Sequence, residues 1–382
     1  MSEKKTNKKK NILFINHSDG LHGAETVLVE LLTHVSSQKE KYNIHIVWNK
    51  INNVRLFADK VSKLSVDSII DVNFRFLGGS IFRNLLVFVY NLLACFKIIL
   101  LIKREKIDVI YTNSSINPIG IICAILTKKK HIWHFHEPVV ASFGWTPTTG
   151  KIYEFFLKYN KNIVVFISQN QKTDWETNLN ISIKNYQLIY NPIKNIEKKE
   201  KSQTLSNIIV FGFMGAFTEN KNISHLIQTF ARLEAEKQTI KLKIAGNGQL
   251  QKKIEIQTKK LNSNNIEVTD YCFDVSSFYA DIDVLVLPSY SEMMPLVVLE
   301  AMSVEKAVIL TEKTGLHEML TNSVDCIFIN PFSDTDLYKA MKKVLLEPEY
   351  RKRLAKNGYE KVNKIDFNNQ FQVSFDKLFK EI

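Results

Sequence analysis

Two glutamates, Glu292 and Glu300, have the residue type and spacing to bind the hydroxyl groups of a sugar or a ribose. An ionised carboxylate accepts hydrogen bonds from such hydroxyls. Pro295 lies between the two glutamates, flanked by Met294 and Leu296, and it suits the first turn of a helix. The backbone N–H groups and the dipole of a helix start attract anions, above all phosphate. This stretch therefore predicts a pocket for a sugar nucleotide.

A strand, a loop and a helix must hold these two carboxylates. The run from Ile282 to Leu287 is apolar and rich in β-branched residues, which predicts a buried strand. Pro288 and Ser289 end that strand, so Glu292 falls on the loop that follows it. Glu300 then falls about a turn and a half inside the next helix, at roughly 3.6 residues per turn.

The beginning of the chain predicts a second unit of the same kind. Asn11 to Asn16 predicts a strand, and the apolar period from Ala24 to Val35 predicts a helix. A strand, a loop and a helix open a doubly wound α/β domain, whose ligand end is the carboxyl edge of its strands. Gly23 is the one useful glycine of the intervening loop, so the loop is not a dinucleotide-binding fingerprint.

The α/β rhythm occurs twice along the chain. A chain of 382 residues favours two domains, because single cores rarely grow past about 250–300 residues. Residues 194–206 are polar, charged and without apolar period, which predicts a linker. We therefore expect a domain over residues 1–193, a second over 207–365 and a final helical segment over 366–382. Further strands are expected at 42–48, 66–72, 107–112, 131–136, 163–167, 188–190, 207–213, 240–245, 266–268, 307–310 and 326–329.

Glu292 and Glu300 also carry a resemblance to a known family. With Met294-Pro295-Leu296 between them and Ala301-Met302 after them, they resemble the E-x7-E motif of retaining glycosyltransferases with the GT-B fold. This family is the glycosyltransferase family 4-like group, or glycosyl transferases group 1. The resemblance implies two Rossmann-like domains that face each other across a cleft. It also implies that the last helix crosses back to the N-terminal, acceptor-side domain.

The resemblance assigns a role to residues on the donor side. Gly215 and Lys221 lie in a loop that would hold the donor diphosphate, and Gly246 lies in a glycine turn near the nucleotide. Glu300 would bind the ribose. One departure weakens the match: Ala216 stands where the family usually has an arginine.

The same resemblance assigns two catalytic residues, Glu292 and His136. Glu292 would hold the sugar hydroxyls, and His136 would contact the sugar near the reacting centre. His134 is the second candidate for this catalytic role, and a purely structural role is the alternative for both histidines. Gly23 resembles part of the family's G-G-A-E loop, which approaches the donor phosphates and the acceptor.

The implied activity is the transfer of a sugar from a UDP- or GDP-linked donor to a hydroxyl acceptor, without a cofactor or a metal. A lipid-linked saccharide of surface polysaccharide assembly is the expected acceptor. Asp281 and Asp283 form a D-x-D triplet, but they begin a strand that enters the core, which disfavours a metal site. The alternative is a non-catalytic GT-B subunit that binds glycan or stabilises a partner glycosyltransferase.

The net charge of +12 favours phosphorylated ligands, anionic membranes or nucleic acid. No aromatic and basic platform for nucleic acid is present, so this partner is not expected. The apolar stretch from Leu85 to Ile102 predicts a helix packed on a sheet, with a membrane span or an amphipathic helix on an anionic bilayer as alternatives. The basic residues 1–11 lack the apolar core of a signal peptide, which predicts a cytoplasmic protein, with the inner membrane face as a further expectation.

Overall fold

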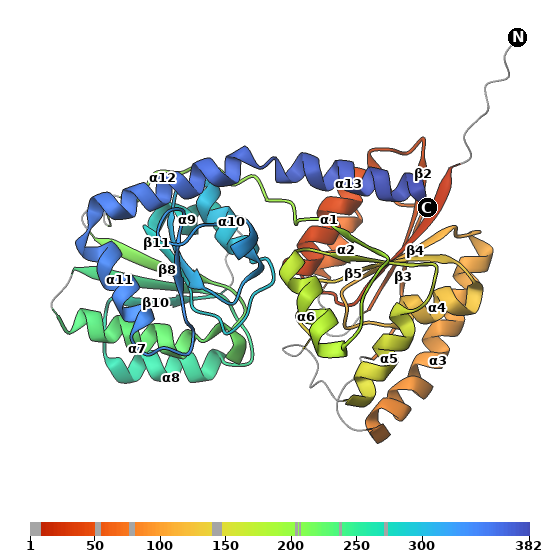
Figure 1. Ribbon diagram of the computed structural model, residues 1–382, viewed down its shortest axis with the longest axis horizontal. Coiled ribbons are helices and arrows are strands. Elements are labelled where there is room, and N and C mark those ends of the chain that lie inside the picture. Colours follow the sequence, from red (N-terminus) through yellow and green to blue (C-terminus); the bar gives the residue numbers. More distant parts are fainter. Residues whose placement is uncertain are drawn as a thin grey trace, which may run out of the picture. The chain divides into compact units, whose positions relative to one another are not determined.

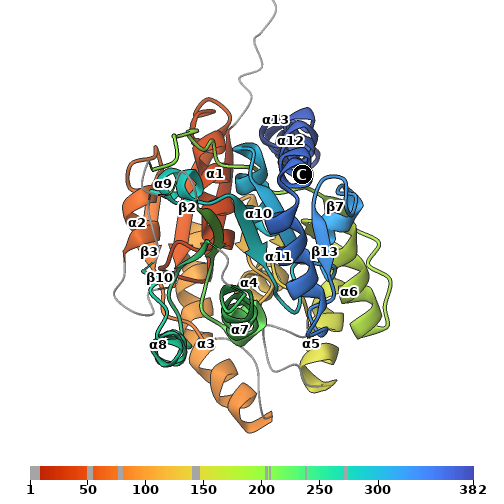
Figure 2. The same ribbon diagram turned by 90° about the vertical axis from the view of Figure 1, so that its left-hand side faces the viewer.

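The structure is a computed structural model that describes residues 9–49, 55–75, 81–139, 147–202, 205, 208–236, 239–270 and 274–382. The predicted basic arm therefore lies mostly outside the described residues, as do residues 203, 204 and 206 of the predicted linker. The chain forms two compact units, the first made of residues 1–192 and 368–382 and the second of residues 193–367. Each unit is a parallel sheet with helices on both faces (Figures 1 and 2), which confirms the predicted α/β class.

The sheet of the first unit has seven parallel strands in the order β3-β2-β1-β4-β5-β6-β7. The order reverses between β1 and β4, as in doubly wound folds. Its strands are β1 (Lys10–Asn16), β2 (Tyr42–Trp48), β3 (Ser68–Asp71), β4 (Val109–Asn113), β5 (Lys130–His134), β6 (Asn162–Phe166) and β7 (Tyr186–Leu188). Its helices are α1 (Gly23–Ser36), α2 (Leu56–Val61), α3 (Ile81–Arg104), α4 (Ile119–Thr127), α5 (Pro147–Leu157), α6 (Gln169–Leu179) and nearly all of α13 (Phe367–Glu381).

Helices cover both faces of this sheet, so side chains of one strand alternate between two cores. Leu13 and Ile15 of β1 join a buried cluster with residues of α3 and α4. Phe14 points to the other face, where its ring meets Phe379 of α13 at 6.4 Å. Figure 1 shows α1 and α13 on one side of the sheet and α3, α4 and α5 on the other.

The helix α13 is fastened to the first unit by aromatic rings and polar contacts. Phe375 is fully buried, and its ring lies 6.1 Å from that of Tyr111 and 5.6 Å from that of His134. Asp376 pairs with Nε2 of His34 at 2.9 Å. The last helix therefore completes the core of the unit that begins the chain.

The sheet of the second unit has six parallel strands in the order β10-β9-β8-β11-β12-β13. Its strands are β8 (Ile209–Met214), β9 (Ile240–Ala245), β10 (Ile266–Thr269), β11 (Val284–Leu287), β12 (Ala307–Thr311) and β13 (Ile327–Ile329). Its helices are the short η2 (Glu219–Lys221) and η3 (Gly315–Glu318), with α7 (Ile223–Glu234), α8 (Gln251–Leu261), α9 (Val275–Asp281), α10 (Leu296–Ser303), α11 (Asp336–Leu346) and α12 (Pro348–Lys364). Figures 1 and 2 show α7 and α8 on one face and α9, α10 and α12 on the other.

The first residues of the predicted linker are held against the second unit by ion pairs. Lys198 pairs with Glu305, Lys199 with Asp274 and Lys201 with Asp283, at 2.6, 2.8 and 2.6 Å. Lys201 also donates to the carbonyl of Ile208 at 2.8 Å. This stretch lacks a regular helix or strand, but its charges give it a fixed course.

The most apolar stretch of the sequence forms α3, which packs on the first sheet as expected. Asn91 on its buried side binds both the N–H and the carbonyl of Arg75, at 2.8 and 2.9 Å. Among the described residues, no helix combines the length and the apolar character that a membrane crossing requires.

Replacing Phe375 by Ala should lower the free energy of unfolding of the first unit by about 3–5 kcal/mol, because it leaves a cavity among buried aromatic rings. Urea unfolding followed by tryptophan fluorescence measures this unit, since the four tryptophans of the chain lie between residues 48 and 175. The control is Val373→Ala on the same helix, where the side chain is 57% exposed. Equal midpoints for the two variants would contradict the packing role of α13.

Candidate functional site

The second unit brings Lys221 and Glu292 together at the carboxyl end of its sheet. Lys221 closes η2, which follows β8, and Glu292 follows β11, the strand beside β8 where the order reverses. Ligands of doubly wound sheets bind at this reversal, because the loops of the two strands turn to opposite faces. Nζ of Lys221 donates to Oε1 of Glu292 at 2.5 Å, and the two side chains are 21% and 11% exposed.

Backbone contacts hold both partners of this ion pair in place. The side chain of Asn220 donates to the carbonyl of Ser291 at 2.9 Å, and the N–H of Tyr290 donates to the carbonyl of Asn220 at 2.8 Å. The N–H of Glu292 donates to the carbonyl of Lys313 at 2.8 Å. Because the loops after β8, β11 and β12 are tied together, the charges of the ion pair are fixed before any ligand binds.

Glu300 lies on α10 in a buried position with one hydroxyl partner. It is the fifth residue of the helix, its side chain is 8% exposed, and Tyr279 Oη donates to its Oε2 at 2.8 Å. Burial raises the pKa of Glu300, while the Tyr279 hydroxyl and the charge of Lys194 oppose that rise. Pro295 caps α10 rather than lying in its first turn, Leu296 is the first helical residue, and Met294 is buried just before them.

Two of the predicted glycines, Gly215 and Gly246, meet in the loops after β8 and β9. A Cβ on Gly246 would lie 1.9 Å from the carbonyl oxygen of Gly215, and the φ of Gly246 is +153°. The N–H of Phe217 donates to the carbonyl of Asn247 at 2.7 Å, which joins the same two loops. The close approach of the two backbones thus explains why residue 246 is a glycine. The contact of this turn with a nucleotide stays a prediction. Ala216 lies in the same joined loops and offers no charge.

The carboxylates of the D-x-D triplet do not begin a strand, which corrects that expectation. Asp281 is the last residue of α9, and β11 begins only at Val284. Asp281 pairs with Lys243 at 2.7 Å, and Asp283 pairs with Lys201 and accepts from the N–H of Val210 at 2.8 Å. Each carboxylate is therefore engaged by its own lysine.

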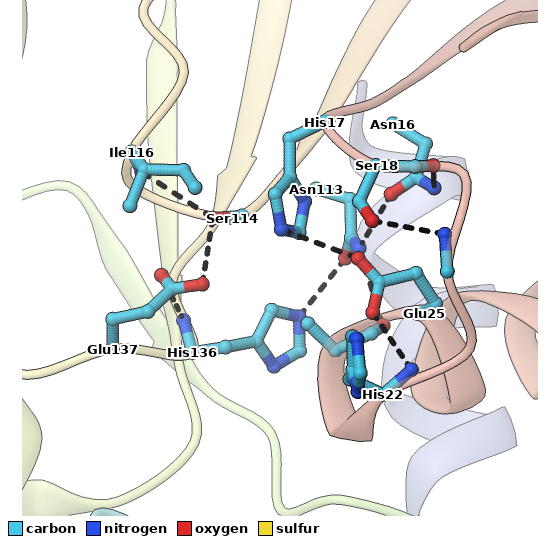
Figure 3. Close-up of polar contacts among 12 residues, drawn as sticks. Asn16, His17, Ser18, His22, Glu25, Asn113, Ser114, Ile116, His136 and Glu137 are labelled. Atoms are coloured by element: carbon cyan, nitrogen blue, oxygen red, sulfur yellow. Dashed lines mark hydrogen bonds and ion pairs between the residues drawn. The ribbon is translucent and has the colours of Figure 1, made fainter. Parts of the chain in front are cut away.

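The first unit places His136 at the reversal point of its own sheet (Figure 3). The side-chain amide of Asn113, at the end of β4, donates to Oδ1 of Asn16, at the end of β1, at 3.1 Å. Nε2 of His136 lies 2.9 Å from Oδ1 of Asn113. Because that oxygen can only accept, Nε2 carries the proton. Burial lowers the pKa of His136 to about 4, so its imidazole is neutral at pH 7.

His136 lies two residues past the end of its strand, and His134 is the residue that ends it. His134 is fully buried, and its Nδ1 lies 2.5 Å from the hydroxyl oxygen of Tyr111. Its ring packs against Phe375, and burial holds its pKa well below the usual range. The structure therefore gives His134 a structural role, whereas His136 is half-buried.

Two further carboxylates, Glu137 and Glu25, lie beside His136 in Figure 3, and neither was among the predicted site residues. Glu137 accepts from both hydroxyls of Ser114 and Ser115 at 2.6 Å. Burial alone would raise the pKa of Glu137, but the charges of His136 and His17 and the two serine hydroxyls lower it below its ordinary value.

Glu25 lies at the start of α1, in the loop that holds Gly23. It is 1% exposed, pairs with Nε2 of His17 at 3.2 Å and accepts from the N–H of His22 at 3.1 Å. A Cβ on Gly23 would meet no protein atom within 4 Å. The space beside Gly23 is therefore open, close to the buried pair of Glu25 and His17.

Comparison with known proteins identifies the family to which this chain belongs. Residues 21–195 match the family model Glycosyltransferase Family 4, and residues 194–361 match the model Glycosyl transferases group 1. The chain belongs to this family of GT-B glycosyltransferases, and its two Rossmann-like sheets are those of the GT-B fold.

Particular relatives agree with that assignment. The chain is 30% identical over 290 residues to the uncharacterized glycosyltransferase MJ1178 of Methanocaldococcus jannaschii, covering 74% of this chain and 78% of the relative. It is 27% identical over 125 residues to the N,N'-diacetylbacillosaminyl-diphospho-undecaprenol alpha-1,3-N-acetylgalactosaminyltransferase of Campylobacter jejuni, covering 32% and 33% of the two chains. The structure of Anabaena HepE in complex with UDP and glucose shares the fold, with a TM-score of 0.78 and 17% identity over 96% of this chain and 98% of HepE.

The neutral state of His136 predicts a loss of stability in acid. Its pKa is about 4 in the folded protein and about 6.5 in the unfolded chain, so its contribution is complete above pH 6.5 and is lost as pH falls toward 4. Between pH 7 and pH 4.5 the wild type should lose about 2 kcal/mol more unfolding free energy than His136→Gln. Urea titrations followed by tryptophan fluorescence measure the difference, and an identical pH dependence in the two proteins would contradict the assignment.

Proposed function

We propose that this glycosyltransferase is a metal-independent enzyme that transfers a sugar from a UDP- or GDP-linked donor with retention of configuration. The observation that carries the proposal is the Lys221–Glu292 ion pair at the reversal point of the second sheet, with Glu300 buried on the next helix. A cation suits the donor diphosphate, and carboxylates suit the hydroxyls of a sugar and a ribose.

In this mechanism the bond from the anomeric carbon to the diphosphate breaks, and a bond from that carbon to the acceptor oxygen forms on the same face. The acceptor proton leaves with the diphosphate. The departing negative charge is the main electrostatic demand, so a fixed cation contributes more than a strong base. Lys221 supplies that cation, with the start of α10 at Pro295 and Leu296 as a second source of positive potential. No metal takes part in this scheme, in which Asp281 and Asp283 hold lysines.

Glu292 orients the sugar, and Glu300 holds the ribose hydroxyls. Glu300 is suited to a neutral hydroxyl partner, because Tyr279 already donates one hydroxyl to it. On the acceptor side, His136 is neutral, and its Nε2–H donates to Oδ1 of Asn113, which leaves Nδ1 as the ring nitrogen that can accept a hydrogen bond. His136 therefore serves as a hydrogen-bonding group toward substrate. The loops with Gly215 and Gly246 shape the donor site, and Gly23 leaves room at the loop before α1.

We further propose that the acceptor is a lipid-linked saccharide of surface polysaccharide assembly. The name of the Campylobacter jejuni relative specifies a diphospho-undecaprenol acceptor and an alpha-1,3 linkage. The net charge of +12 suits a cytoplasmic enzyme that works at an anionic inner membrane face.

The donor site can be tested by calorimetric titration with UDP and GDP. We expect one of the two to bind, and Lys221→Gln and Glu300→Ala to bind it roughly tenfold to a hundredfold more weakly, because each variant loses a charge-assisted hydrogen bond. Glu360→Ala is the control, since that exposed glutamate lies on α12 and faces Lys356 at 4.0 Å. Absence of binding by the wild type would overturn the donor site and favour a non-catalytic subunit, with Ala216 as the reason.

Glu292→Gln should separate nucleotide binding from transfer. Removing this carboxylate leaves Lys221 without its ion-pair partner, so UDP or GDP should bind a few-fold more tightly. Sugar transfer to an acceptor should nevertheless fall about a hundredfold, because the sugar loses its orienting hydrogen bonds. Proton NMR of the product measures both the rate and the anomeric configuration. An inverted product would contradict retention, and an unchanged rate would contradict the role of Glu292.

A further inference from the structure

A continuous apolar stripe runs along the outer face of α3. Its members follow one another at alternating intervals of four and three residues, which places them on one side of a helix. They are Phe82, Leu86, Val89, Leu93, Phe96 and Leu100, with exposed fractions of 81%, 72%, 57%, 74%, 62% and 50%. Leu92 and Tyr90 widen the stripe, at 51% and 40% exposed. No other helix in the described part of the chain exposes more than two large apolar side chains.

The exposure of this stripe does not come from a detached helix. Ala94, Cys95, Ile98, Leu101 and Ile102 on the opposite side of α3 are buried in one cluster with strands of the first sheet and with α4. Figure 1 shows α3 beside α4 on the same face of the sheet. A helix with one apolar side buried and another apolar side exposed needs a second apolar environment.

The charges carried by α3 itself are all positive, whereas two acidic residues lie nearby: Asp71 shares a pocket with Tyr90, Leu93 and Lys97, and Glu105 pairs with Arg104 at 2.7 Å. The 24 residues of α3 include no aspartate or glutamate. Lys97 and Arg104 flank the stripe and are exposed, and Lys103 continues it at the next interval of three residues. Basic residues therefore border the apolar surface toward the C-terminal end of the helix.

The positive border continues beyond α3 to the amino edge of the sheet. The side chain of Asn11, in β1, donates to the carbonyl of Lys106 at 3.2 Å, which joins the end of α3 to the start of the first strand. A cavity of about 410 Å³ lies at this edge, with Asp108 as its one acidic side chain. Six lysines line it, namely Lys9, Lys10, Lys128, Lys129, Lys130 and Lys161.

Two occupants have to be compared, a second copy of this chain and a lipid bilayer. The interval of four and three residues is that of a helix pair. In such a pair, however, Lys97 and Arg104 flank the contact, so those of one copy would lie near those of the other. No acidic residue of α3 is present to offset the repulsion between these cations. An anionic bilayer offers acyl chains for the stripe and negative headgroups for the basic border.

We propose that α3 is a membrane-docking helix that lies in the surface of an anionic bilayer, with the side chains of the apolar stripe among the acyl chains and the basic border at the headgroups. The inference deepens the proposed function, since it rests on a lipid-linked acceptor and names the surface that brings the enzyme to it. Vesicle binding needs no donor, so its outcome is separate from that of nucleotide titration or sugar transfer.

The test is flotation of the full chain with vesicles of phosphatidylcholine alone and of phosphatidylcholine with 30% phosphatidylglycerol. We expect binding to the anionic vesicles. Leu93→Glu with Phe96→Glu should weaken it at least about a hundredfold, because two apolar side chains no longer enter the bilayer. Lys97→Gln with Lys103→Gln should weaken it roughly thirtyfold on anionic vesicles only.

The matched control is Ile256→Glu with Leu346→Glu, which introduces the same charges at two exposed apolar positions of the second unit, 56% exposed each. An unchanged affinity of each variant for UDP or GDP and an unchanged tryptophan spectrum show that the fold is intact. The proposal is overturned by a wild type that does not float, or by equal loss in the control. It is also overturned by a dimer in sedimentation equilibrium that Leu93→Glu with Phe96→Glu dissociates while vesicle binding is absent.

Discussion

The order of strands in each sheet is the constraint on which both candidate sites depend. A parallel strand returns to its sheet only by a crossover on one face, and the direction of the crossovers changes where the order reverses. At β8 and β11 this change separates the following loops, and Lys221 and Glu292 come from these loops. At β1 and β4 the same change separates the loops that follow Asn16 and Asn113. Asn113 donates to Asn16 and accepts from His136, so this pair positions the histidine. The chemistry of each unit is therefore positioned by topology rather than by closeness in sequence.

The sequence was sufficient for the fold class and for most strands, because buried parallel strands are short apolar runs bounded by polar loops. The expected strands at 42–48 and 240–245 have the bounds of β2 and β9. The helix α4 was not predicted, since its residues are apolar on every side and give no helical period. The sequence showed α3 as a helix but could not show that only one of its apolar sides is buried, because burial depends on the neighbours that the topology provides.

The site was only partly accessible to sequence reasoning. The E-x7-E motif located Glu292 and Glu300, and the loop with Gly215 located Lys221. The ion pair between Lys221 and Glu292, however, joins residues 71 positions apart, which no local pattern can specify. Glu137 was passed over as a loop residue. The available signal was the Ser114-Ser115 pair after β4, because hydroxyls donate to carboxylates and the ends of neighbouring parallel strands lie at the same edge of a sheet. Whether His134 or His136 faces outward depended on where β5 ends, and strand ends are the least certain part of such a prediction.

The placement of α13 bears on how the protein folds as it is synthesised. Residues 368–382 supply Phe371, Phe375 and Phe379 to the aromatic layer behind β1, β4 and β5, although those strands are made about 230 to 370 residues earlier. The second unit is continuous in sequence, so all of its residues are synthesised before residues 368–382. The first unit is translated earlier but gains its final layer later, so it must wait with an exposed aromatic surface until residues 368–382 have emerged. The order of synthesis and the order of completion are thus opposite in this chain.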